Sequence, residues 1–411
     1  MSISVHDYDP LDIAVIENPY PYYAQLRTTT PVHWIESVKG YAVSRWDDVQ
    51  TVLRDVGTYS SMGFWPELLG PFDPVPEVLP MISLDPPRHT VIRKLANKAF
   101  TPKLVNALEA RFRQIANSLI DDLVSSHGPS GRFDFVERYS GLFPVSVISE
   151  LLGVDVDRRQ EFKTWADDIL SASNRAGFSA ARAAEVQASK SAIRSYFEEL
   201  HDRRSAAPGD DMFSSFIHAE IDGQKLSPEE AINLGVLLLI GGIETTTNLI
   251  GNTVAHFGGF GRSNALDLLP DLLPLIDEML RLEAPTQLLF RHTTRDTHLA
   301  SFHIPKGSLV MPLLGSANRD DRKFEDPDRF ILKRAPRDNL TFGQGPHACV
   351  GSYLSRIEAK VALEVLVNRF ERLEVVEKSR SWIHSFFARG PRALATSYLA
   401  AADGDLVRAA H

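Results

Sequence analysis

The feature that most constrains the fold is a long apolar segment, residues 227–257, with the periodicity of a single helix. Ser227 is a favourable N-cap, Pro228 stands at the first helical position, and Glu230 completes a capping box. Apolar residues continue to the end of the segment, where a glycine pair is expected to stop the helix. At 1.5 Å per residue such a helix is about 45 Å long. Because it is apolar on most sides, we expect it to cross the middle of the protein.

Composition and charge exclude several classes of protein. The chain of 411 residues has 44 Lys and Arg against 53 Asp and Glu, and its net charge of -9 argues against nucleic acid as the main partner. One cysteine cannot form an internal disulfide, which fits a reducing compartment. The first residues lack a basic segment followed by an apolar run, and the run LGVLLLIGGI (234–243) is too short to span a bilayer. We therefore expect a cytoplasmic protein without a membrane anchor.

Strand patterns are few and short. VHWI (32–35) and YAVS (41–44) flank a Lys-Gly turn and predict a hairpin, and LASFHI (299–304) and SLVMPL (308–313) predict a second one. Most of the remaining chain has helical periodicity. The sequence therefore predicts a mainly α fold with small β-sheets, in a single domain spanning residues 1–411. Its clearest helical segments are 103–125, 144–152, 180–202, 227–257, 270–282 and 352–370.

An irregular stretch at residues 58–83 is rich in Pro and Gly and carries several large apolar side chains. A structureless loop of this length is uncommon inside a domain and is often a lid or a binding loop. A packed excursion without a function is an equally good interpretation, and the residues alone leave both open.

The middle of the long segment reads IGGIETTT, residues 240–247. Two glycines in a helix interior cost about 1 kcal/mol each relative to alanine, and an unpaired carboxylate such as Glu244 is costly among apolar residues. One interpretation is a close helix–helix contact through the glycines, with Glu244 paired elsewhere. The other is a helix opened where a flat group approaches, with an acid and a hydroxyl, Thr245, beside it.

Two shorter patterns have an ordinary interpretation when taken alone. In HTVIR (89–93), His89 and Arg93 are four apart on one helix face, which is also what a solvated basic face looks like. In EMLR (278–281), Glu278 and Arg281 can pair on one face, as many surface residues do.

The only cysteine lies in FGQGPHACVG, residues 342–351. The three glycines permit tight turns and a close approach to a bulky group, and the dipole of the helix that follows favours a thiolate at Cys349. A lone cysteine is often only a small buried apolar residue. That interpretation explains neither the glycines nor His347, whereas a thiolate presented to an axial site on iron explains both.

Taken together and in this order, the segments resemble the cytochrome P-450 family, in its soluble bacterial form. FGQGPHACVG matches the heme signature Phe-x-x-Gly-x-His/Arg-x-Cys-x-Gly, and Pro346 is the one departure, where members more often carry a free N–H. ENPYPYYAQLR (17–27), PVSVISELLGV (144–154) and FEDPDRF (324–330) resemble the first helix, the E-helix and the meander of the family. The resemblance implies a triangular-prism fold, an orthogonal helix bundle with heme b between the long I-helix, about 227–257, and the Cys349 loop.

The resemblance also implies roles for individual residues. Cys349 is similar to the iron ligand, and Glu244 and Thr245 to the pair that delivers protons during oxygen activation. The other residues implied to contact heme are His89, Arg93, Gly241, Arg291, Phe342, His347 and Gly351. Those implied to brace the fold are Glu278, Arg281 and Arg329. Those expected to line the substrate pocket are Phe64, Trp65, Leu237, Ile240, Leu288, Leu289 and Phe386.

The function that the resemblance implies is an O2-dependent monooxygenase acting on an apolar small molecule, such as a terpenoid, a polyketide or an aromatic secondary metabolite. No flavin, phosphate-loop or iron–sulfur pattern is present in the sequence, so electrons from NAD(P)H are expected to arrive through a separate ferredoxin and its reductase. We expect a monomer. Basic residues that could form the docking face for the ferredoxin are Lys94, Lys98, Lys103 and Arg356.

Two alternatives remain from the sequence. The first is a peroxygenase driven by hydrogen peroxide, against which the intact Glu244–Thr245 pair argues, because peroxide already carries the protons that this pair would supply. The second is a heme-binding sensor or carrier without catalysis. A sensor needs an output module, and residues 371–411 are too few for one.

Overall fold

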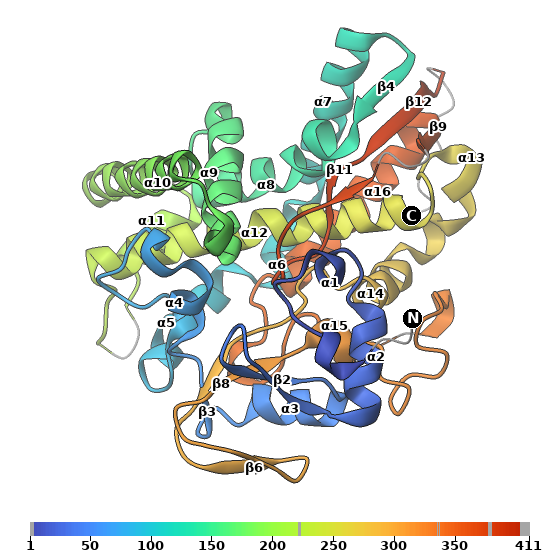
Figure 1. Cartoon of the computed structure of the whole chain (residues 1–411). Helices are drawn as coiled ribbons and strands as arrows, with labels where there is room; N and C mark the ends of the chain where they lie inside the picture. Colours follow the sequence, from blue (N-terminus) through green and yellow to red (C-terminus); the bar gives the residue numbers. More distant parts are fainter. Residues whose placement is uncertain (1–3, 221–222, 335, 337, 377–379, 403–411) are drawn as a thin grey trace.

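The structure is a computed structural model that describes residues 4–220, 223–334, 336, 338–376 and 380–402. Helices dominate it, and they gather around one long helix that crosses the molecule (Figure 1). This arrangement confirms the predicted mainly α class. The helices are α1 (Ile13–Glu17), α2 (Tyr20–Thr29), α3 (Trp46–Arg54), α4 (Phe64–Leu69), α5 (Arg88–Ala99), α6 (Pro102–Ala107), α7 (Glu109–His127), α8 (Leu142–Leu152), α9 (Arg159–Ser171), α10 (Ala180–Ala206), α11 (Met212–His218), α12 (Pro228–His256), α13 (Arg262–Ala265), α14 (Leu272–Leu282), α15 (Leu314–Ala317) and α16 (Ser352–Arg369).

Helix α12 forms as its sequence predicts. The Ser227 hydroxyl accepts a hydrogen bond from the Glu230 N–H, and the Glu230 carboxylate accepts one from the Ser227 N–H at 2.9 Å. The helix then continues without a break to His256. Among the described residues it is the one helix long and apolar enough to cross a membrane, but 78% of its most apolar window is buried inside the protein. It is therefore the central core helix, as predicted.

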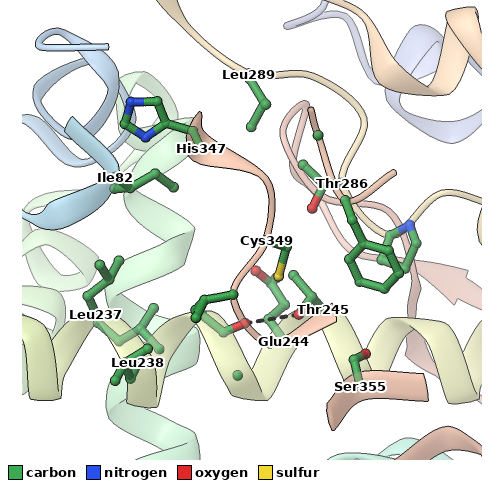
Figure 2. A pocket seen from close by; sticks show the side chains of 18 of the residues that line it. Ile82, Leu237, Leu238, Glu244, Thr245, Thr286, Leu289, His347, Cys349 and Ser355 are labelled. Atoms are coloured by element: carbon green, nitrogen blue, oxygen red, sulfur yellow. Dashed lines mark hydrogen bonds between the residues drawn. The ribbon is translucent and has the colours of Figure 1, made fainter. Parts of the chain in front are cut away.

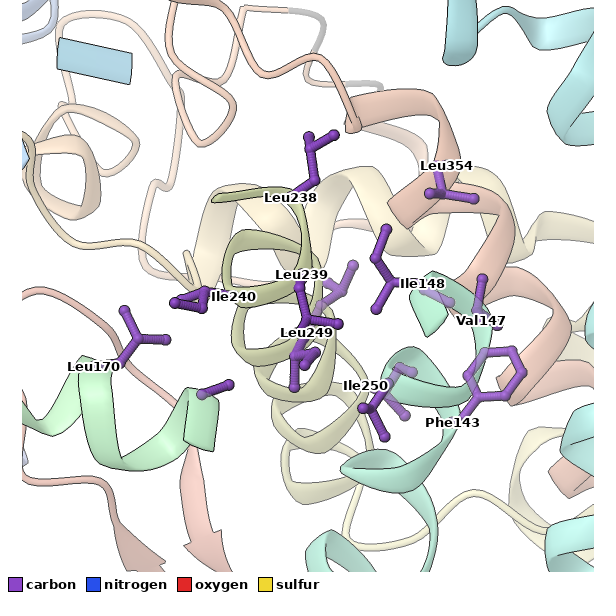
Figure 3. Close-up of a cluster of buried hydrophobic side chains, with 14 of the residues drawn as sticks. Phe143, Val147, Ile148, Leu170, Leu238, Leu239, Ile240, Leu249, Ile250 and Leu354 are labelled. Carbon is purple, nitrogen blue, oxygen red and sulfur yellow. The ribbon is translucent and has the colours of Figure 1, made fainter. Parts of the chain in front are cut away.

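The core lies where α12 packs against α8, α9, α10 and α16. Figure 3 shows this cluster: Ile148 of α8 and Leu354 of α16 lie beside the leucines and isoleucines of α12. Five other helices confirm predicted segments, with their ends shifted by a few residues: α7, α8, α10, α14 and α16. The segment 103–125 is divided into α6 and α7 at Leu108, which caps both helices.

Strands form four small sheets. The largest has five strands in the order β1-β2-β8-β5-β3, and a second has three strands in the order β4-β12-β9, bringing together segments far apart in the sequence. The other two are the pairs β6-β7 and β10-β11. The strands are β1 (Val32–Ile35), β2 (Gly40–Val43), β3 (Tyr59–Ser60), β4 (Ser130–Asp134), β5 (Arg291–Thr293), β6 (Thr297–Leu299), β7 (Phe302–Ile304), β8 (Leu309–Pro312), β9 (Phe370–Val375), β10 (Ser381–Trp382), β11 (Pro391–Ala393) and β12 (Ala395–Ala400).

One predicted hairpin is confirmed and the other is wrong. Strands β1 and β2 pair with Val32 opposite Val43, as expected. Strand β7, however, pairs with β6, whereas β8 pairs with β2 and β5. The turn between β6 and β7 is made by Ala300 and Ser301, both with positive φ (47° and 69°), as a tight two-residue hairpin requires. The Pro-Gly sequence after Ile304 is a longer connection that lets the chain join the larger sheet.

The stretch at residues 58–83 is more regular than its sequence suggests, and it is packed. It contains β3 and α4 and packs its aromatic side chains inward: Phe64 and Trp65 are buried. Arg175 holds α4 from the outside by donating to the main-chain oxygens of Glu67 and Leu68 at 3.0 and 3.1 Å. The apolar residues of this stretch supply the hydrophobic burial that orders it.

A buried ion-pair network confirms Glu278 and Arg281 as a pair and corrects the third member. The Arg281 guanidinium donates twice to the Glu278 carboxylate, at 2.9 and 2.8 Å, and both side chains are fully buried. Arg334, not Arg329, is the second cation, with Nε 3.0 Å from Glu278 Oε1. Arg329 contributes its carbonyl oxygen to Arg281, while its side chain points outward and pairs with Asp326. The meander therefore turns Arg329 away from the core and brings Arg334, five residues later, into it.

Candidate functional site

A cavity of about 250 Å³ lies between α12 and the loop that carries Cys349. In Figure 2 this loop descends from His347 through Cys349 toward α12, and α12 carries Leu237, Glu244 and Thr245 along the lower edge of the view. The 58–83 stretch and the segment before β5 complete the walls. All ten residues predicted to touch heme or to deliver protons line this one cavity: His89, Arg93, Gly241, Glu244, Thr245, Arg291, Phe342, His347, Cys349 and Gly351.

The two glycines of α12 face different neighbours. A Cβ on Gly241 would meet nothing within 4 Å, because this residue faces the cavity. A Cβ on Gly242 would lie 3.3 Å from Ile148 of α8. Part of each sequence interpretation therefore holds: Gly242 permits a close helix–helix contact, and Gly241 leaves room in the cavity. The helix itself is not opened, since α12 is continuous here.

Thr245 and Glu244 are the polar residues that follow. The Thr245 hydroxyl donates to the Gly241 carbonyl at 2.9 Å, one turn back in the helix (Figure 2). The pKa of Glu244 is raised to about 7, chiefly by burial and also by Asp167 of α9, while Lys163 partly opposes the shift. A carboxyl group with this pKa takes up and releases protons near neutral pH.

The Cys349 loop is shaped by its glycines and by one main-chain bond. Gly343 and Gly345 have φ of 66° and 73°, and a Cβ on Gly345 would meet the Leu53 carbonyl oxygen at 2.8 Å. The Cys349 N–H donates to the Phe342 carbonyl at 2.8 Å and closes the loop. Cys349 is accessible where it faces the cavity.

The ionisation of Cys349 differs from the sequence expectation. Burial raises the pKa of its thiol, and this effect outweighs the lowering by the Gly351 N–H, Arg93 and Arg356. In the chain without a bound metal ion, these groups together therefore do not lower the pKa of the thiol below its usual value. A bound metal ion would reverse the balance, since a coordinating thiol is deprotonated outright.

Four basic side chains converge at one edge of the cavity: His89, Arg93, Arg291 and His347. The two imidazole rings lie 4.1 Å apart between centroids. His89 Nε2, His347 Nε2 and Arg291 Nε are all buried without a hydrogen-bond partner in the described part of the chain. Arg291 uses one of its other nitrogens to reach the Phe290 carbonyl at 2.7 Å.

Burial disfavours the charged forms of these four basic side chains and lowers their pKa values. The pKa of Arg291 is lowered to about 10, chiefly by burial, and that of His347 is lowered to about 3 by burial together with its basic neighbours. Burial also lowers the pKa of His89 and of Arg93. An anion at this edge would oppose all four shifts and use the free N–H groups. The thiol, the basic cluster and the space beside Gly241 thus fit heme b, with its iron at Cys349 and its propionates at the cluster.

The predicted pocket residues divide into two groups. Phe64, Trp65, Leu237, Ile240 and Leu289 line the cavity. Leu288 and Phe386 do not, and both predictions are corrected. Leu288 is fully buried in a bridge to Leu313, and Phe386 lies beside a second, smaller hollow near Tyr8.

Leu288 belongs to an extended segment, where successive side chains point in opposite directions, whereas Phe386 lies in a bend of the chain. Leu289 and Phe387, each one residue later, are the ones that face the cavity. The sequence shows that such a segment is apolar but does not show which of two neighbours faces inward.

Several lining residues were not predicted. Ile82, Leu170, Leu238, Thr286 and Phe387 extend the walls around the expected pocket. Ile82 and Phe387 lie in segments that the sequence had marked, so their apolar neighbours were a usable indication. Leu170 lies on α9, which no sequence pattern connected with the site.

Three polar lining residues also went unpredicted: Thr246, Ser355 and Glu358. In addition, Arg356 is less available as a docking residue than expected. Its Nε donates to Asp277 at 2.7 Å, and its guanidinium lies 4.5 Å above the Phe342 ring.

Comparisons with known proteins agree with this geometry. The family model for cytochrome P-450 matches residues 262–388. Cytochrome P-450 107B1 of Saccharopolyspora erythraea is 36% identical over 94% of this chain and 96% of its own length. The erythromycin C-12 hydroxylase of the same species is 34% identical, over 85% of this chain and 86% of its own. The structure of CYP109Q5 from Chondromyces apiculatus has a TM-score of 0.87 at 36% identity, covering 97% of this chain and 99% of that one. This chain therefore belongs to the cytochrome P-450 family and is a monooxygenase of that family.

Proposed function

We propose that this enzyme inserts one oxygen atom of O2 into an apolar, uncharged or weakly polar small molecule, with Cys349 as the iron ligand and Glu244 and Thr245 as the proton-delivering residues. The observation that carries the proposal is the shared cavity: Cys349 on one side, Gly241, Glu244 and Thr245 of α12 on the other, and a basic cluster at its edge. Enzymes of the family bind heme b and use O2, with electrons from NAD(P)H delivered by separate proteins.

When bound, heme b supplies the iron chemistry that activates O2, and a thiolate ligand favours cleavage of the O–O bond. The chain's own contribution is to hold, orient and protonate. Cys349 is held by its main-chain bond to Phe342, and the absence of a side chain at Gly351 keeps the space next to the sulfur free. His89, Arg93, Arg291 and His347 bind the propionates as charged donors.

Proton delivery is the role we assign to Glu244 and Thr245. With its pKa raised to about 7, Glu244 exchanges protons near neutral pH and can pass one on through water. The Thr245 hydroxyl is neutral and donates to the Gly241 carbonyl, so both lone pairs of its oxygen remain available to accept from water in the cavity. It can orient the water that carries the proton to the reacting end of the cavity.

The substrate class follows from the walls. Away from the Cys349 loop, the basic cluster and the glutamates of α12 and α16, the walls are mostly apolar: Phe64, Trp65, Ile82, Leu237, Ile240, Thr286, Leu289 and Phe387. A polyketide, a terpenoid or an aromatic metabolite suits such walls, and a small carboxylate does not. The relative that hydroxylates erythromycin at C-12 supports the polyketide among these classes.

Electrons are proposed to come from a ferredoxin and its reductase, as is general for bacterial members of the family. Lys94, Lys98 and Lys103 are exposed on α5 and at the start of α6, next to the segment that carries His89 and Arg93. We propose these lysines as part of the docking face and leave Arg356 out, because it is only partly exposed and its guanidinium lies over the Phe342 ring. A monomeric, cytoplasmic enzyme fits this arrangement.

The test begins with a screen for compounds that shift the spin state of the heme in the purified enzyme. With the tightest compound found, wild type and Thr245→Ala are compared for product, hydrogen peroxide and NAD(P)H in the same reactions. We expect normal binding in the variant, continued NAD(P)H use, and diversion of electrons to hydrogen peroxide, so that product per NAD(P)H falls. Thr245→Ser keeps the hydroxyl and should retain most of the coupling.

Wild-type coupling in Thr245→Ala would show that another donor activates oxygen here. Efficient turnover with hydrogen peroxide alone would instead support a peroxygenase. A small carboxylate as the tightest ligand would contradict the proposed substrate class.

A further inference from the structure

The hairpin formed by β6 and β7 places two histidines side by side on the surface of the protein. His298 of β6 stands directly opposite His303 of β7 in the antiparallel register. Their ring centroids are 5.2 Å apart, with an angle of 55° between the ring planes. Both residues are exposed, and Figure 1 shows β6 at the lower edge of the molecule, away from α12. The pair is not part of the cavity that contains Cys349.

The local structure fixes the position of this pair. Successive side chains of a strand face opposite sides, and the other side of the hairpin carries Leu299 and Ile304, whose exposed fractions are 6% and 0%. A slip of one residue in the register would expose these two side chains and bury the imidazoles. The tight turn of Ala300 and Ser301, both with positive φ, joins the strands in the observed register. The two histidines are therefore held together on the solvent side.

Neither imidazole is engaged by another side chain of the described residues. Their ring contact with each other is the one interaction that joins them to the described chain beyond the strand pairing. The charged residues that precede β6 are turned to other partners. Arg295 donates to the Thr58 hydroxyl at 2.7 Å. Asp296 Oδ1 accepts from the Lys306 N–H at 2.8 Å. The imidazole nitrogens are thus available to a ligand from solution.

The spacing of the two rings fits a shared metal ion. With a metal–nitrogen bond of about 2.0–2.1 Å, two imidazoles on one tetrahedral ion have ring centroids roughly 5 Å apart. The observed 5.2 Å agrees with this spacing. Neutral imidazole is a common ligand for Zn²⁺, Cu²⁺ and Ni²⁺. Stacking alone is a weak reason for the pair, because two protonated histidines directly opposite each other destabilise a strand pair.

A second pair of histidines provides a comparison. His6 lies in the short helix Val5–Asp7, and His33 lies in β1. Their ring centroids are 6.3 Å apart, and the rings meet edge to face. No strand register links these two elements, and the spacing is wider than in the hairpin. This pair therefore serves as a control for adventitious metal binding by neighbouring histidines.

We propose that His298 and His303 form a bidentate site for a divalent transition-metal ion, such as Cu²⁺ or Zn²⁺. Each imidazole supplies one nitrogen. No group of three or more His, Cys, Asp or Glu suited to a metal ion occurs among the described residues, so water takes the remaining positions on the ion. Because the two ligands come together only in the folded hairpin, the ion favours that folded state. The site is separate from heme and does not depend on the proposed function.

The first experiment is a calorimetric titration of the heme-loaded enzyme, without a histidine tag, with Cu²⁺, which binds most tightly among the divalent ions of its series. His298→Asn and His303→Asn should each weaken binding at the site by at least about tenfold, because the second imidazole of the native pair binds at an effective concentration in the millimolar range or above. His33→Asn is the matched control and should leave the affinity unchanged. The heme absorption spectrum checks that each variant is folded.

The second experiment counts the ligands. Pulsed EPR of Cu²⁺ added at one equivalent detects the remote nitrogen of each coordinated imidazole, after subtraction of the heme signal. Wild type and His33→Asn should show two imidazoles on the ion. His298→Asn and His303→Asn should show one at most.

The outcomes decide the proposal in either direction. Two imidazoles in wild type, together with weaker binding in both hairpin variants, support it. No measurable binding to wild type, an unchanged affinity in either hairpin variant, or loss of the site in His33→Asn overturns it. Neither experiment uses turnover, so a failure here leaves the proposed function untouched, and a failure of the proposed function leaves this result standing.

Discussion

Two groups of buried charges in this protein differ in how the chain itself treats them. The Glu278 carboxylate is matched by Arg281 and Arg334, and every contact comes from the chain. Around Arg291, by contrast, four basic side chains meet, and the nearby carboxylate, Asp85, is already bonded to Ser60 and to the Ser61 N–H.

This difference distinguishes a group of charges that stabilises the fold from one that binds a ligand. A buried ion pair that is complete keeps the fold in one arrangement and leaves nothing for a ligand. A buried cluster of basic side chains, in which nitrogens are left without hydrogen-bond partners, destabilises the protein by itself and is stabilised by an anion from outside. The same contrast holds for acids on α16, where Glu364 is paired and Glu358 is not.

The largest effect is expected from breaking the complete pair. Arg281→Ala leaves Glu278 buried with only Arg334, which should cost about 3–5 kcal/mol of the free energy of unfolding. The measurement is denaturant unfolding of the heme-loaded enzyme, with heme retention followed in the same samples. A loss below about 1 kcal/mol would show that Arg334 suffices and that the pair is not the brace we describe.

In the basic cluster around Arg291, a substitution should weaken heme binding without lowering the stability of the heme-free protein. Arg291→Leu removes a charged donor for the heme carboxylates, worth about 1.5–3 kcal/mol, so heme should leave about 10 to 100 times faster. The stability of the heme-free protein should not fall, because the substitution removes a buried cation without an ion-pair partner among the described residues. Transfer of heme to apomyoglobin and unfolding of the heme-free protein measure the two effects. A variant that loses stability and keeps its heme would erase the distinction between the two clusters.

Features that depend on neighbouring residues in the sequence were predicted correctly, and features that depend on distant contacts were not. The capping box of α12, the glycines around Cys349 and the Glu278–Arg281 spacing are local patterns, and each gave the correct element or contact. The partner of Glu278 was placed at Arg329 and is Arg334, because the path of the meander depends on packing across the fold. Strand β8 was paired with its neighbour in sequence, but it completes a sheet with β2 and β5.

Residues on extended segments and bends were the least predictable part of the site. Leu288 and Phe386 were expected in the pocket, and the next residue along faces it in both cases. Whether a side chain there faces the cavity changes from one residue to the next, and only the tertiary structure determines which of two neighbours does so. Glu358 was missed for another reason: in the sequence it looks like one more charged residue of an amphipathic helix.

A smaller effect should appear in the pH dependence of stability. The pKa of Glu244 is raised from 4.5 to about 7 in the folded state, so its contribution is fully present below pH 4.5 and is lost as the pH rises through about 7. Wild type should therefore lose about 1–2 kcal/mol relative to Glu244→Gln across this window, reduced because the side chain reaches the cavity and its water. Unfolding of both proteins in heme-free form at about pH 5 and pH 8 measures it. Parallel curves would mean that the carboxyl group is not buried as described.

The smallest effects distinguish two arginines of the meander. Arg334→Ala removes a hydrogen-bonded cation from Glu278 and should cost about 1 kcal/mol. Arg329→Ala should change the free energy of unfolding by less than about 0.5 kcal/mol, because its side chain is exposed and only its main chain contacts Arg281. Urea unfolding of the two variants side by side compares them. If Arg329→Ala is the more harmful, our correction is wrong.

The central claim is that Cys349 binds the iron of heme b as a thiolate, while the basic cluster around Arg291 binds the heme carboxylates. The most direct measurement is the absorption spectrum of fresh, folded enzyme, reduced and bound to carbon monoxide. A strongly red-shifted Soret band, typical of thiolate-ligated heme, is the expected result, and Cys349→His should lose it. His89 and His347 stand in the same cavity. A Soret band typical of histidine-ligated heme in the wild-type enzyme would therefore contradict the assignment of Cys349.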